Sequence, residues 1–353
     1  MKKALCLLGL INMGMVYGAE TVGKVNLPTE LADPSSVVTW AGKVKGYCEG
    51  PAGLPDGSVI FSDGNSKQIR RVSPEGVLGT FANIDGPNGN ELGLDGKVYA
   101  CARDGIYRFG LDGGAKTKVV DFAKSPSCND LTVATNGDIY FTNWGDKVYY
   151  WKFGSPANNV KDALTGMRTA NGIEYIEESK TIYVNESLAS RCMRYTVSSD
   201  GVLTLPTQFG SKVDEADGIT YDELGNLYAA SYNEGKILVF NPKGELIGNV
   251  HVNAIPNDYA GQPKANYPFA GSTSNCAFGG KDFKTLYITG DGGLYAAQLK
   301  VAGRKKPNPA VGLSSLRNKT VAFVQTKPLA ALNRNITGRW VLNMKRIPVN
   351  IGE

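Results

Sequence analysis

The sequence contains a single histidine, His251, among its 353 residues. One imidazole excludes a zinc site built from several histidines, a histidine-ligated di-metal centre and a haem held by two histidines. Its six cysteines include no C-x-x-C pair, so neither a zinc ribbon nor a dense disulfide framework is indicated. Beyond a short apolar run at the amino end, no stretch approaches the roughly 20 apolar residues of a membrane-spanning helix.

The composition is that of an ordinary globular protein. Hydrophobic residues make up 42% of the chain, charged residues 20%, and the formal net charge is +5. These values exclude a disordered or collagen-like chain and allow one large domain or two small ones. The chain has 43 glycines and 17 tyrosines, and Asn-Gly and Asp-Gly pairs recur. This pattern predicts many short strands joined by tight turns.

The amino end, residues 1–18, has the features of a secretory signal peptide. Lys2 and Lys3 precede an apolar run over residues 4–11, and small residues follow near Gly18. We therefore expect a secreted or periplasmic protein. The alternative interpretation is a buried amino-terminal strand.

A repeat of roughly forty residues organises the chain, and such a period is typical of β-propeller blades. Each of six units opens with a carboxylate or carboxamide, continues as an apolar strand, turns at a polar or glycine cluster and returns as a second strand. The opening residues, spaced 39 to 58 residues apart, are Glu49, Asn88, Asn129, Asn171, Asp217 and Asn275. In four units a glycine follows eight positions later: Gly57, Gly96, Gly137 and Gly225. Third strands are expected over 68–72, 105–109, 236–240 and 293–297.

The repeat predicts an all-β protein, a six-bladed β-propeller over residues 19–300. Residues 37–40 would supply the outermost strand of the last blade and so remove an open edge. A β-sandwich or a β-helix is the alternative. Residues 301–353 form a basic extension with ten lysines and arginines against one acid. It could bind an anionic polymer or a membrane surface, but we favour packing across an acidic face of its own domain. The extension lacks the interleaved aromatics of a nucleic-acid platform.

The six opening residues would converge at one mouth of the propeller channel, because the first strand of each blade lines it. Two carboxylates and four carboxamides, without imidazoles or paired thiols, form a set of hard oxygen donors. Such a set suits calcium, magnesium or manganese, and zinc less naturally. The alternative is that these side chains only cap the local backbone at the start of each strand.

Six short motifs carry a family resemblance over about residues 45–300. In order they are Glu49-Gly-Pro, Asn88-Gly-Asn, Cys128-Asn129-Asp130, Asn171-Gly-Ile, Asp217-Gly-Ile and Asn275-Cys-Ala-Phe-Gly-Gly. Together they resemble the senescence-marker-protein/gluconolactonase/luciferin-regenerating-enzyme-like family. The third motif is also similar to the related squid-type diisopropylfluorophosphatase.

The resemblance implies a catalytic divalent cation at the channel centre, calcium in the first place, with magnesium, manganese or zinc as alternatives. Its ligands would be Glu49, Asn171 and Asp217, with Asn129 as a fourth ligand or a substrate contact. Family members open lactones or hydrolyse organophosphate esters. Asp217 would act as general base or as nucleophile. Asn88 and Asn275, the remaining opening residues, are interpreted as substrate contacts.

Two departures from the family pattern leave the substrate open. Many lactonase members have an arginine where this chain has Ser127, and many bacterial members have a histidine after the second-unit cysteine, where this chain reads Cys101-Ala102-Arg103. Arg103 could take over anion binding or be a solvated arginine at a strand end.

Several other residues have two interpretations. Cys48, Cys128 and Cys276 flank opening residues and could be packed small hydrophobes, a disulfide pair or thiols near a metal; we favour packing. His251 is interpreted as a strand residue. Trp144 belongs either to the core or to the wall of the mouth.

The sequence thus predicts an exported, divalent-metal-dependent hydrolase that opens a lactone or similar ester. One alternative is a non-catalytic propeller that keeps the metal and binds a ligand or partner. The other keeps the site but hydrolyses phosphotriesters, or performs a lyase or isomerase step on a secondary metabolite.

Overall fold

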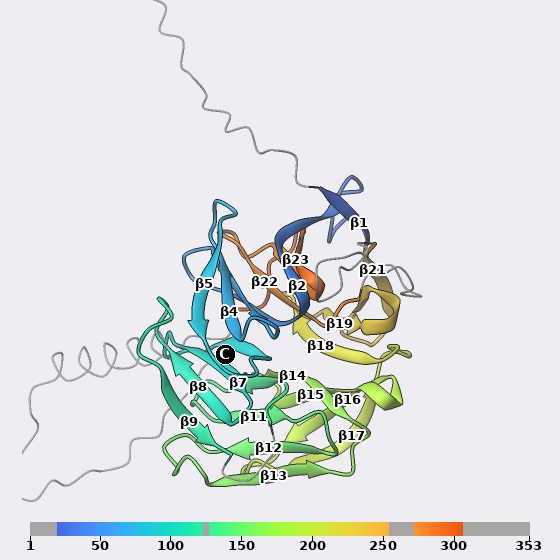
Figure 1. Cartoon of the computed structure of the whole chain (residues 1–353). Helices are drawn as coiled ribbons and strands as arrows, with labels where there is room; N and C mark the ends of the chain where they lie inside the picture. The colour runs from blue at the N-terminus through green and yellow to red at the C-terminus, as the bar shows by residue number, and fades with distance from the viewer. Residues whose placement is uncertain (1–19, 123–126, 254–271, 306–353) are drawn as a thin grey trace, which may run out of the picture. The chain divides into compact units, whose positions relative to one another are not determined.

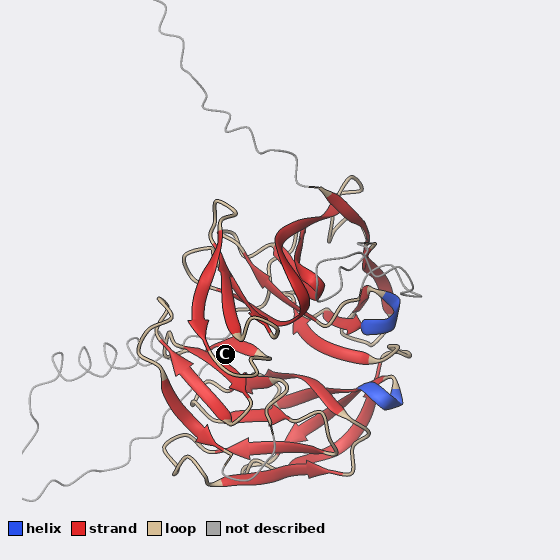
Figure 2. Cartoon of the chain, in the orientation of Figure 1, coloured by secondary structure: helices blue, strands red, loops and turns tan. Residues whose placement is uncertain are grey.

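A computed structural model describes residues 20–122, 127–253 and 272–305 of the chain (Figure 1). Within these ranges the chain forms antiparallel β-strands and two short 3-10 helices, η1 (Ser187–Ala189) and η2 (Tyr232–Glu234) (Figure 2). The all-β prediction is therefore confirmed. None of the described helices is long and apolar enough to cross a bilayer. The predicted signal peptide and all but residues 301–305 of the basic extension lie outside the described residues.

Three sheets each consist of four consecutive strands that pair antiparallel in chain order. The first contains β6 (Asn90–Leu92), β7 (Val98–Ala102), β8 (Gly105–Phe109) and β9 (Thr117–Asp121). The second contains β10 (Leu131–Val133), β11 (Ile139–Thr142), β12 (Lys147–Trp151) and β13 (Val160–Thr165). The third contains β14 (Ala170–Ile176), β15 (Thr181–Glu186), β16 (Arg191–Val197) and β17 (Leu203–Phe209).

A larger sheet joins the two ends of the described chain. Its path runs through β18 (Ala216–Tyr221), β19 (Leu227–Ser231), β20 (Lys236–Phe240), β21 (Leu246–Val252), β1 (Thr21–Asn26), β2 (Val37–Gly53), β3 (Val59–Asp63), β4 (Gln68–Val72) and β5 (Leu78–Asn83). Off this path, β22 (Asn275–Gly279) pairs with β23 (Thr285–Gln298), which pairs in turn with β2.

The amino-terminal half of β2 lies beside the last strand. Val38 is opposite Ala297 and Trp40 is opposite Tyr295, so residues 37–40 pair with the end of the repeat as predicted. Contrary to the prediction, they are not the outermost strand, because their other edge pairs with β1. One strand was not predicted: β1 lies outside β2 and also pairs with β21. Through these pairs β1 covers two strand edges that would otherwise be open to pairing with other chains.

The four repeat glycines sit in the tight turns that join the first two strands of their units. Gly57, Gly96, Gly137 and Gly225 have φ angles of 85°, 69°, 88° and 82°, a left-handed conformation that favours glycine. The preceding Asp56, Asp95 and Asn136 accept hydrogen bonds from the backbone N–H two residues on, at 3.0, 3.1 and 3.0 Å. Local Asx chemistry therefore fixes three of these turns.

The strands that begin the repeat units contact one another in sequence. β2 contacts β6, β6 contacts β10, and the series continues through β14, β18 and β22 back to β2. This arrangement brings the opening residues of all six units into one region.

Apolar side chains between neighbouring sheets form the core. One cluster combines Tyr140 and Val148 of the second four-stranded sheet with Ile182 and Val184 of the third. Another, around β23, contains Ile288, which is fully buried. Each sheet thus buries its faces against its neighbours.

The core around β23 yields a stability prediction. Ile288→Ala removes a fully buried side chain and should lower the free energy of unfolding by about 2–5 kcal/mol, whereas Ile288→Val should cost about 0.5–1.5 kcal/mol. Urea denaturation followed by circular dichroism measures both. Val77→Ala, at a turn residue 67% exposed, is the matched control and should change little. Equal stability of Ile288→Ala and Val77→Ala would contradict this description of the core.

Candidate functional site

Two cavities adjoin the first strands of the units. The first, called here the site cavity, has a volume of about 510 Å³, and five predicted site residues line it: Asn88, Arg103, Asn129, Asn171 and Asp217. The second cavity, of about 450 Å³, is lined by Asn275 and by a different part of the same strands. Glu49 appears in neither lining. The site cavity therefore gathers most of the predicted set, whereas Asn275 lines the second cavity.

Glu49 is a buried carboxylate in the part of β2 that pairs with β3, and it is 2% exposed. Tyr47, which lines the site cavity, donates a hydrogen bond from its hydroxyl to Oε1 at 2.8 Å. Oε2 accepts from the backbone N–H of Gly50 at 2.7 Å and from Nδ2 of Asn275 at 3.0 Å. Burial nevertheless raises the pKa of Glu49, because water no longer solvates its charge. The carboxylate is held in one orientation by three donors.

Asp217 is the second buried carboxylate and belongs to β18. It is 5% exposed, and its Oδ1 has no hydrogen-bond partner among the described residues. Burial raises its pKa well above the usual value, and the charge of Glu49 raises it further. A buried anionic oxygen without a partner is costly unless a cation or a proton neutralises it.

Three carboxamides line the site cavity beside Asp217: Asn88, Asn129 and Asn171. Asn171 donates from Nδ2 to the hydroxyl of Ser187 at 3.0 Å, and Ser187 donates to the carbonyl of Ala216 at 2.7 Å. The amide nitrogen of Asn171 is thereby held in place. Oδ1 of Asn88 is buried and has no partner within the described part of the chain. Asn129 is half-buried, and its backbone N–H donates to the carbonyl of Thr142 at 2.8 Å.

These donors fit a divalent cation that prefers oxygen ligands. Among the described residues no three histidine, cysteine, aspartate or glutamate side chains lie together as metal ligands, so a set that contains Glu49 and Asp217 would need carboxamide oxygens as well. Two carboxylates, Glu49 and Asp217, with carboxamide oxygens beside them suit calcium or magnesium. The partnerless Oδ1 of Asp217 is the specific feature that such an ion would satisfy.

Arg103 lines the site cavity, but its charge is already paired. Its Nε lies 2.8 Å from Oδ2 of Asp85, and Nζ of Lys67 lies 2.9 Å from the other oxygen of the same carboxylate. The side chain of Arg103 is 69% exposed. The structure thus places Arg103 at the cavity, in an exposed ion pair.

Trp144 lines the site cavity rather than the core. It is 59% exposed and its φ angle is 56°, a strained conformation for a large residue. Of its two interpretations, the wall of the mouth is therefore the one that the structure supports. Ser127, one of the two departures from the family pattern noted in the sequence, lines the same cavity.

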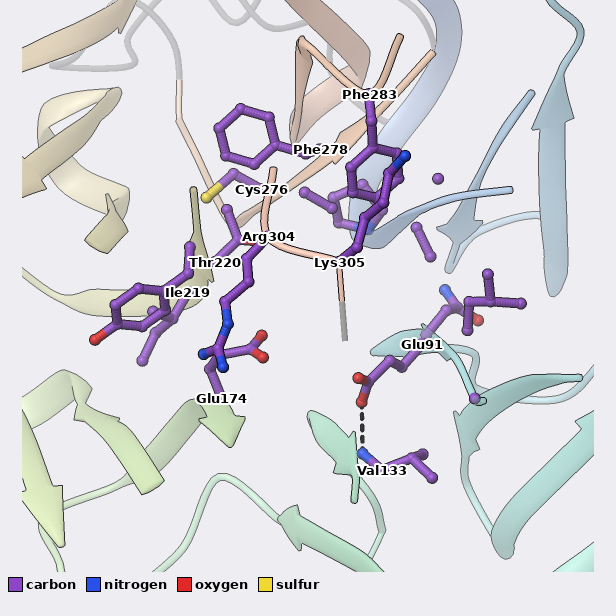
Figure 3. Close-up of a pocket in the computed structure, with 18 of the residues that line it drawn as sticks. Glu91, Val133, Glu174, Ile219, Thr220, Cys276, Phe278, Phe283, Arg304 and Lys305 are labelled. Atoms are coloured by element: carbon purple, nitrogen blue, oxygen red, sulfur yellow. Dashed lines mark hydrogen bonds between the residues drawn. The ribbon is translucent and has the colours of Figure 1, made fainter. Parts of the chain in front are cut away.

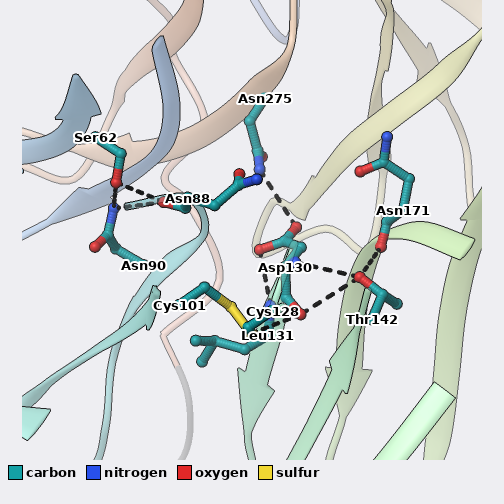
Figure 4. Close-up of a disulfide and its surroundings, with 10 residues drawn as sticks. All are labelled: Ser62, Asn88, Asn90, Cys101, Cys128, Asp130, Leu131, Thr142, Asn171 and Asn275. Atoms are coloured by element: carbon teal, nitrogen blue, oxygen red, sulfur yellow. Dashed lines mark hydrogen bonds between the residues drawn. A yellow bond between two sulfur atoms is a disulfide. The ribbon is translucent and has the colours of Figure 1, made fainter. Parts of the chain in front are cut away.

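The second cavity contains acids that the sequence analysis did not assign. Asp130 is buried and accepts from Nδ2 of Asn275 at 3.3 Å, a bond drawn in Figure 4. Burial raises the pKa of Asp130 to about 8, with a further contribution from Glu49. Figure 3 shows the guanidinium of Arg304 beside the carboxylate of Glu174 on the wall of this cavity. Asn275 therefore links Glu49 to Asp130 and does not face the site cavity.

The favoured interpretation of the cysteines as packed small hydrophobes holds for two of the three and fails for the third. Cys48 and Cys276 are free and buried, as packed small hydrophobes are. Packing was the wrong interpretation for Cys128, which forms a disulfide with Cys101. His251 is half-buried in β21 with Lys24 and Lys236 opposite it, which confirms its assignment as a strand residue.

The described residues define a class of protein: an all-β chain of successive antiparallel meanders whose first strands, or the residues just before them, bring Asp217 and three asparagines to one cavity. The sequence model of the family described as SMP-30/gluconolactonase/LRE-like region matches residues 47–291, and the chain belongs to this family.

Several known proteins are similar to this chain. Lactonase drp35 of Staphylococcus saprophyticus is 28% identical over 185 residues, which cover 46% of this chain and 56% of that protein. The chain thus matches little more than half the length of this relative. A gluconolactonase from Xanthomonas campestris has a TM-score of 0.64 at 22% identity, with 80% of this chain and 99% of that chain covered. The calcium-binding protein regucalcin from Agrobacterium tumefaciens has a TM-score of 0.61 at 17% identity, with 81% and 97% covered. The two structures show a shared fold.

The raised pKa of Asp130 predicts how stability depends on pH. An unfolded aspartate titrates near pH 3.9, so between about pH 4 and 8 the folded state holds the proton more tightly than the unfolded state. The free energy of unfolding of metal-free protein should therefore fall as pH rises through this window. Urea denaturation at pH 5 and pH 8 measures the fall, and Asp130→Asn should reduce it.

Asp104→Asn is the control for this comparison. Lys118 lowers the pKa of Asp104, so this carboxylate is ionised in both states between pH 5 and 8 and its removal should leave the fall unchanged. A fall as steep in Asp130→Asn as in the wild type would contradict the assignment.

Proposed function

We propose that residues 19–300 form a six-bladed β-propeller that hydrolyses a lactone or a similar ester with one divalent cation. The observation that carries the proposal is the partnerless Oδ1 of the buried Asp217, close to Glu49 and at the wall of the site cavity. Membership of the SMP-30/gluconolactonase family supports it, as do the names of the lactonase and gluconolactonase relatives. The cyclic succession of contacts among β2, β6, β10, β14, β18 and β22 supports six blades.

Glu49, Asn171 and Asp217 would hold the cation, with Asn129 as a fourth ligand or a substrate contact. Calcium is the first choice, because the donors are carboxylate and carboxamide oxygens and a relative of the same fold is a calcium-binding protein. Bound there, a divalent cation would polarise the substrate carbonyl and lower the pKa of a water molecule.

Asp217 would carry the bond-making step in one of two ways. As a general base it would take a proton from the water that attacks the carbonyl carbon. As a nucleophile it would attack that carbon itself, so that the ester C–O bond breaks, the alkoxide oxygen takes up a proton and an acyl-aspartate forms, which water then hydrolyses to the acid and free Asp217. Both routes require an ionised Asp217. Burial favours the protonated form of this carboxyl group, whereas a neighbouring positive charge favours the ionised form.

The surrounding residues would hold this pair in place and shape the substrate pocket. Tyr47 and Asn275 fix the Glu49 carboxylate by donating to its two oxygens. Ser187 fixes the amide of Asn171. Asn88, with its free oxygen, would contact the substrate, and Trp144 would form a wall of the cavity mouth.

Replacement of the proposed base tests this function. Asp217→Asn should lower kcat for lactone hydrolysis by about 100-fold or more, because it removes the proton acceptor or nucleophile. Turnover is followed with a pH indicator on sugar lactones, aliphatic lactones, aryl esters and a phosphotriester, with metal-stripped protein before and after addition of calcium, magnesium, manganese or zinc. We expect turnover only with metal.

The matched control is Asp162→Asn. Asp162 is an exposed residue of β13 that forms an ion pair with Lys147, and its replacement should leave the rate at the wild-type value. Unchanged turnover in Asp217→Asn would contradict the mechanism. Metal binding without turnover of any substrate would favour the non-catalytic propeller, and turnover of the phosphotriester alone would favour that reaction instead.

We also propose that the protein is exported and that residues 1–18 are removed. The Cys101–Cys128 disulfide supports export, since structural disulfides persist in oxidising compartments. Mass spectrometry of the protein recovered from the medium or periplasm should find a chain that begins near residue 19. Recovery from the cytoplasm with Met1 intact would contradict export.

A further inference from the structure

The Cys101–Cys128 disulfide joins two neighbouring sheets beside the site cavity. Cys101 belongs to β7, and Cys128 precedes β10 by three positions. Both side chains are buried, their Cα atoms are 5.0 Å apart, and 27 positions separate them in the sequence. Cys128 also lines the site cavity, close to the asparagine and aspartate residues drawn in Figure 4.

Two candidate site residues are bonded to the cysteines of this disulfide. Asn129 follows Cys128 in the chain, and Asn88 is hydrogen-bonded to Cys101 through the backbone. The backbone N–H of Asn88 donates to the carbonyl of Cys101 at 3.2 Å, and the N–H of Cys101 donates to the carbonyl of Gly89 at 2.8 Å. On the other side, Cys128 is bonded to Asn129, whose carbonyl accepts from the N–H of Gly89 at 2.8 Å. The S–S bond therefore ties β7, which is hydrogen-bonded to Asn88 and Gly89, to the segment that carries Asn129.

The site residues of these units lie where the strand ladder is interrupted or has not yet begun. Asn171 lies in the register shift between β14 and β15, and Asp217 lies in the one between β18 and β19. Asn88 and Asn129 precede β6 and β10, which have only three residues each. At the units of Asn88 and Asn129 a covalent link is added, which ties β7 to the segment before β10.

The other cysteines near the site make no such link. Cys48 and Cys276 each flank a proposed site residue, and both are free. The disulfide is therefore present at the two units whose first strands are shortest.

We propose that the Cys101–Cys128 disulfide is a positioning element of the cation site, so that metal affinity and turnover depend on its oxidation. The inference rests on the proposed function, because it assumes that Asn88 and Asn129 face the cation or its substrate. Reduction by dithiothreitol transfers two electrons: the S–S bond breaks, two thiols form, and the dithiol closes to a cyclic disulfide.

The test compares the double variant Cys101→Ala/Cys128→Ala with the wild type in the full-length protein. Calcium affinity is measured by isothermal titration calorimetry. The kinetic constants kcat and KM are measured with the lactone that the wild type hydrolyses fastest. We expect calcium affinity to weaken by about 10- to 100-fold, the range typical of residues that orient metal ligands. Both proteins are compared at a temperature where circular dichroism shows them folded. Cys192→Ala, which removes a free buried cysteine of β16, is the control and should bind calcium like the wild type.

Reduction of the folded wild type provides the same test without a mutation. Peptide mapping follows the loss of the 101–128 link after dithiothreitol, and calcium affinity should fall to that of the double variant. The double variant itself should not respond to dithiothreitol. This measurement decides the matter even where the double variant does not fold.

Two outcomes would overturn the proposal, and they differ from failure of the proposed function. A double variant or reduced wild type with a lower Tm but unchanged calcium affinity and turnover would reduce the disulfide to a general stabiliser. If Cys192→Ala weakened calcium binding as much as the double variant does, the effect would not be specific to the disulfide. A wild type that binds no divalent cation would contradict the proposed function itself, together with this inference.

Discussion

Two buried carboxylates, Glu49 and Asp217, share one small region of the fold, and the rest of the site is arranged around them. Removing two like charges from water is costly, and burial accordingly raises the pKa of both groups. Glu49 is partly compensated by three hydrogen-bond donors, whereas Oδ1 of Asp217 has none in the described structure. An arrangement of this kind is stable only with a proton or a cation, which links the fold directly to the proposed chemistry.

The repeat explains how distant parts of the sequence reach this pair. Each unit begins with a strand that contacts the first strands of the units before and after it. Asn171 and Asp217 therefore line one cavity, and Glu49 lies close enough to act on the charge of Asp217, although the three are far apart in the chain. Strands β1 and β2 join the amino-terminal segment to β21 and β23. The site therefore depends on long-range pairing, and a local change in one unit is felt by side chains of several others.

Much of this could be predicted from the sequence because it follows from local patterns. The alternation of apolar residues, the spacing of the opening residues and the turn glycines predict strands and their order, and Gly57 and Gly96 have the expected left-handed φ. The gathering of Asn88, Asn129, Asn171 and Asp217 at one cavity follows from equivalent positions in successive units.

What could not be predicted depends on contacts between side chains of different units. Asn275 occupies the same position in its unit as the other opening residues do in theirs. Its amide, however, donates hydrogen bonds to Glu49 and Asp130, and Asn275 lines the second cavity. The disulfide between Cys101 and Cys128 depends on the distance between two neighbouring sheets, and this distance cannot be read from the spacing of the cysteines along the chain.

The most direct test of the central claim is a crystal structure of the protein grown with manganese, with an anomalous difference map. This account predicts one strong peak within coordination distance of oxygen atoms of Glu49, Asn171 and Asp217. A map without a peak there, or with manganese bound only elsewhere, would contradict the claim that these residues form a cation site.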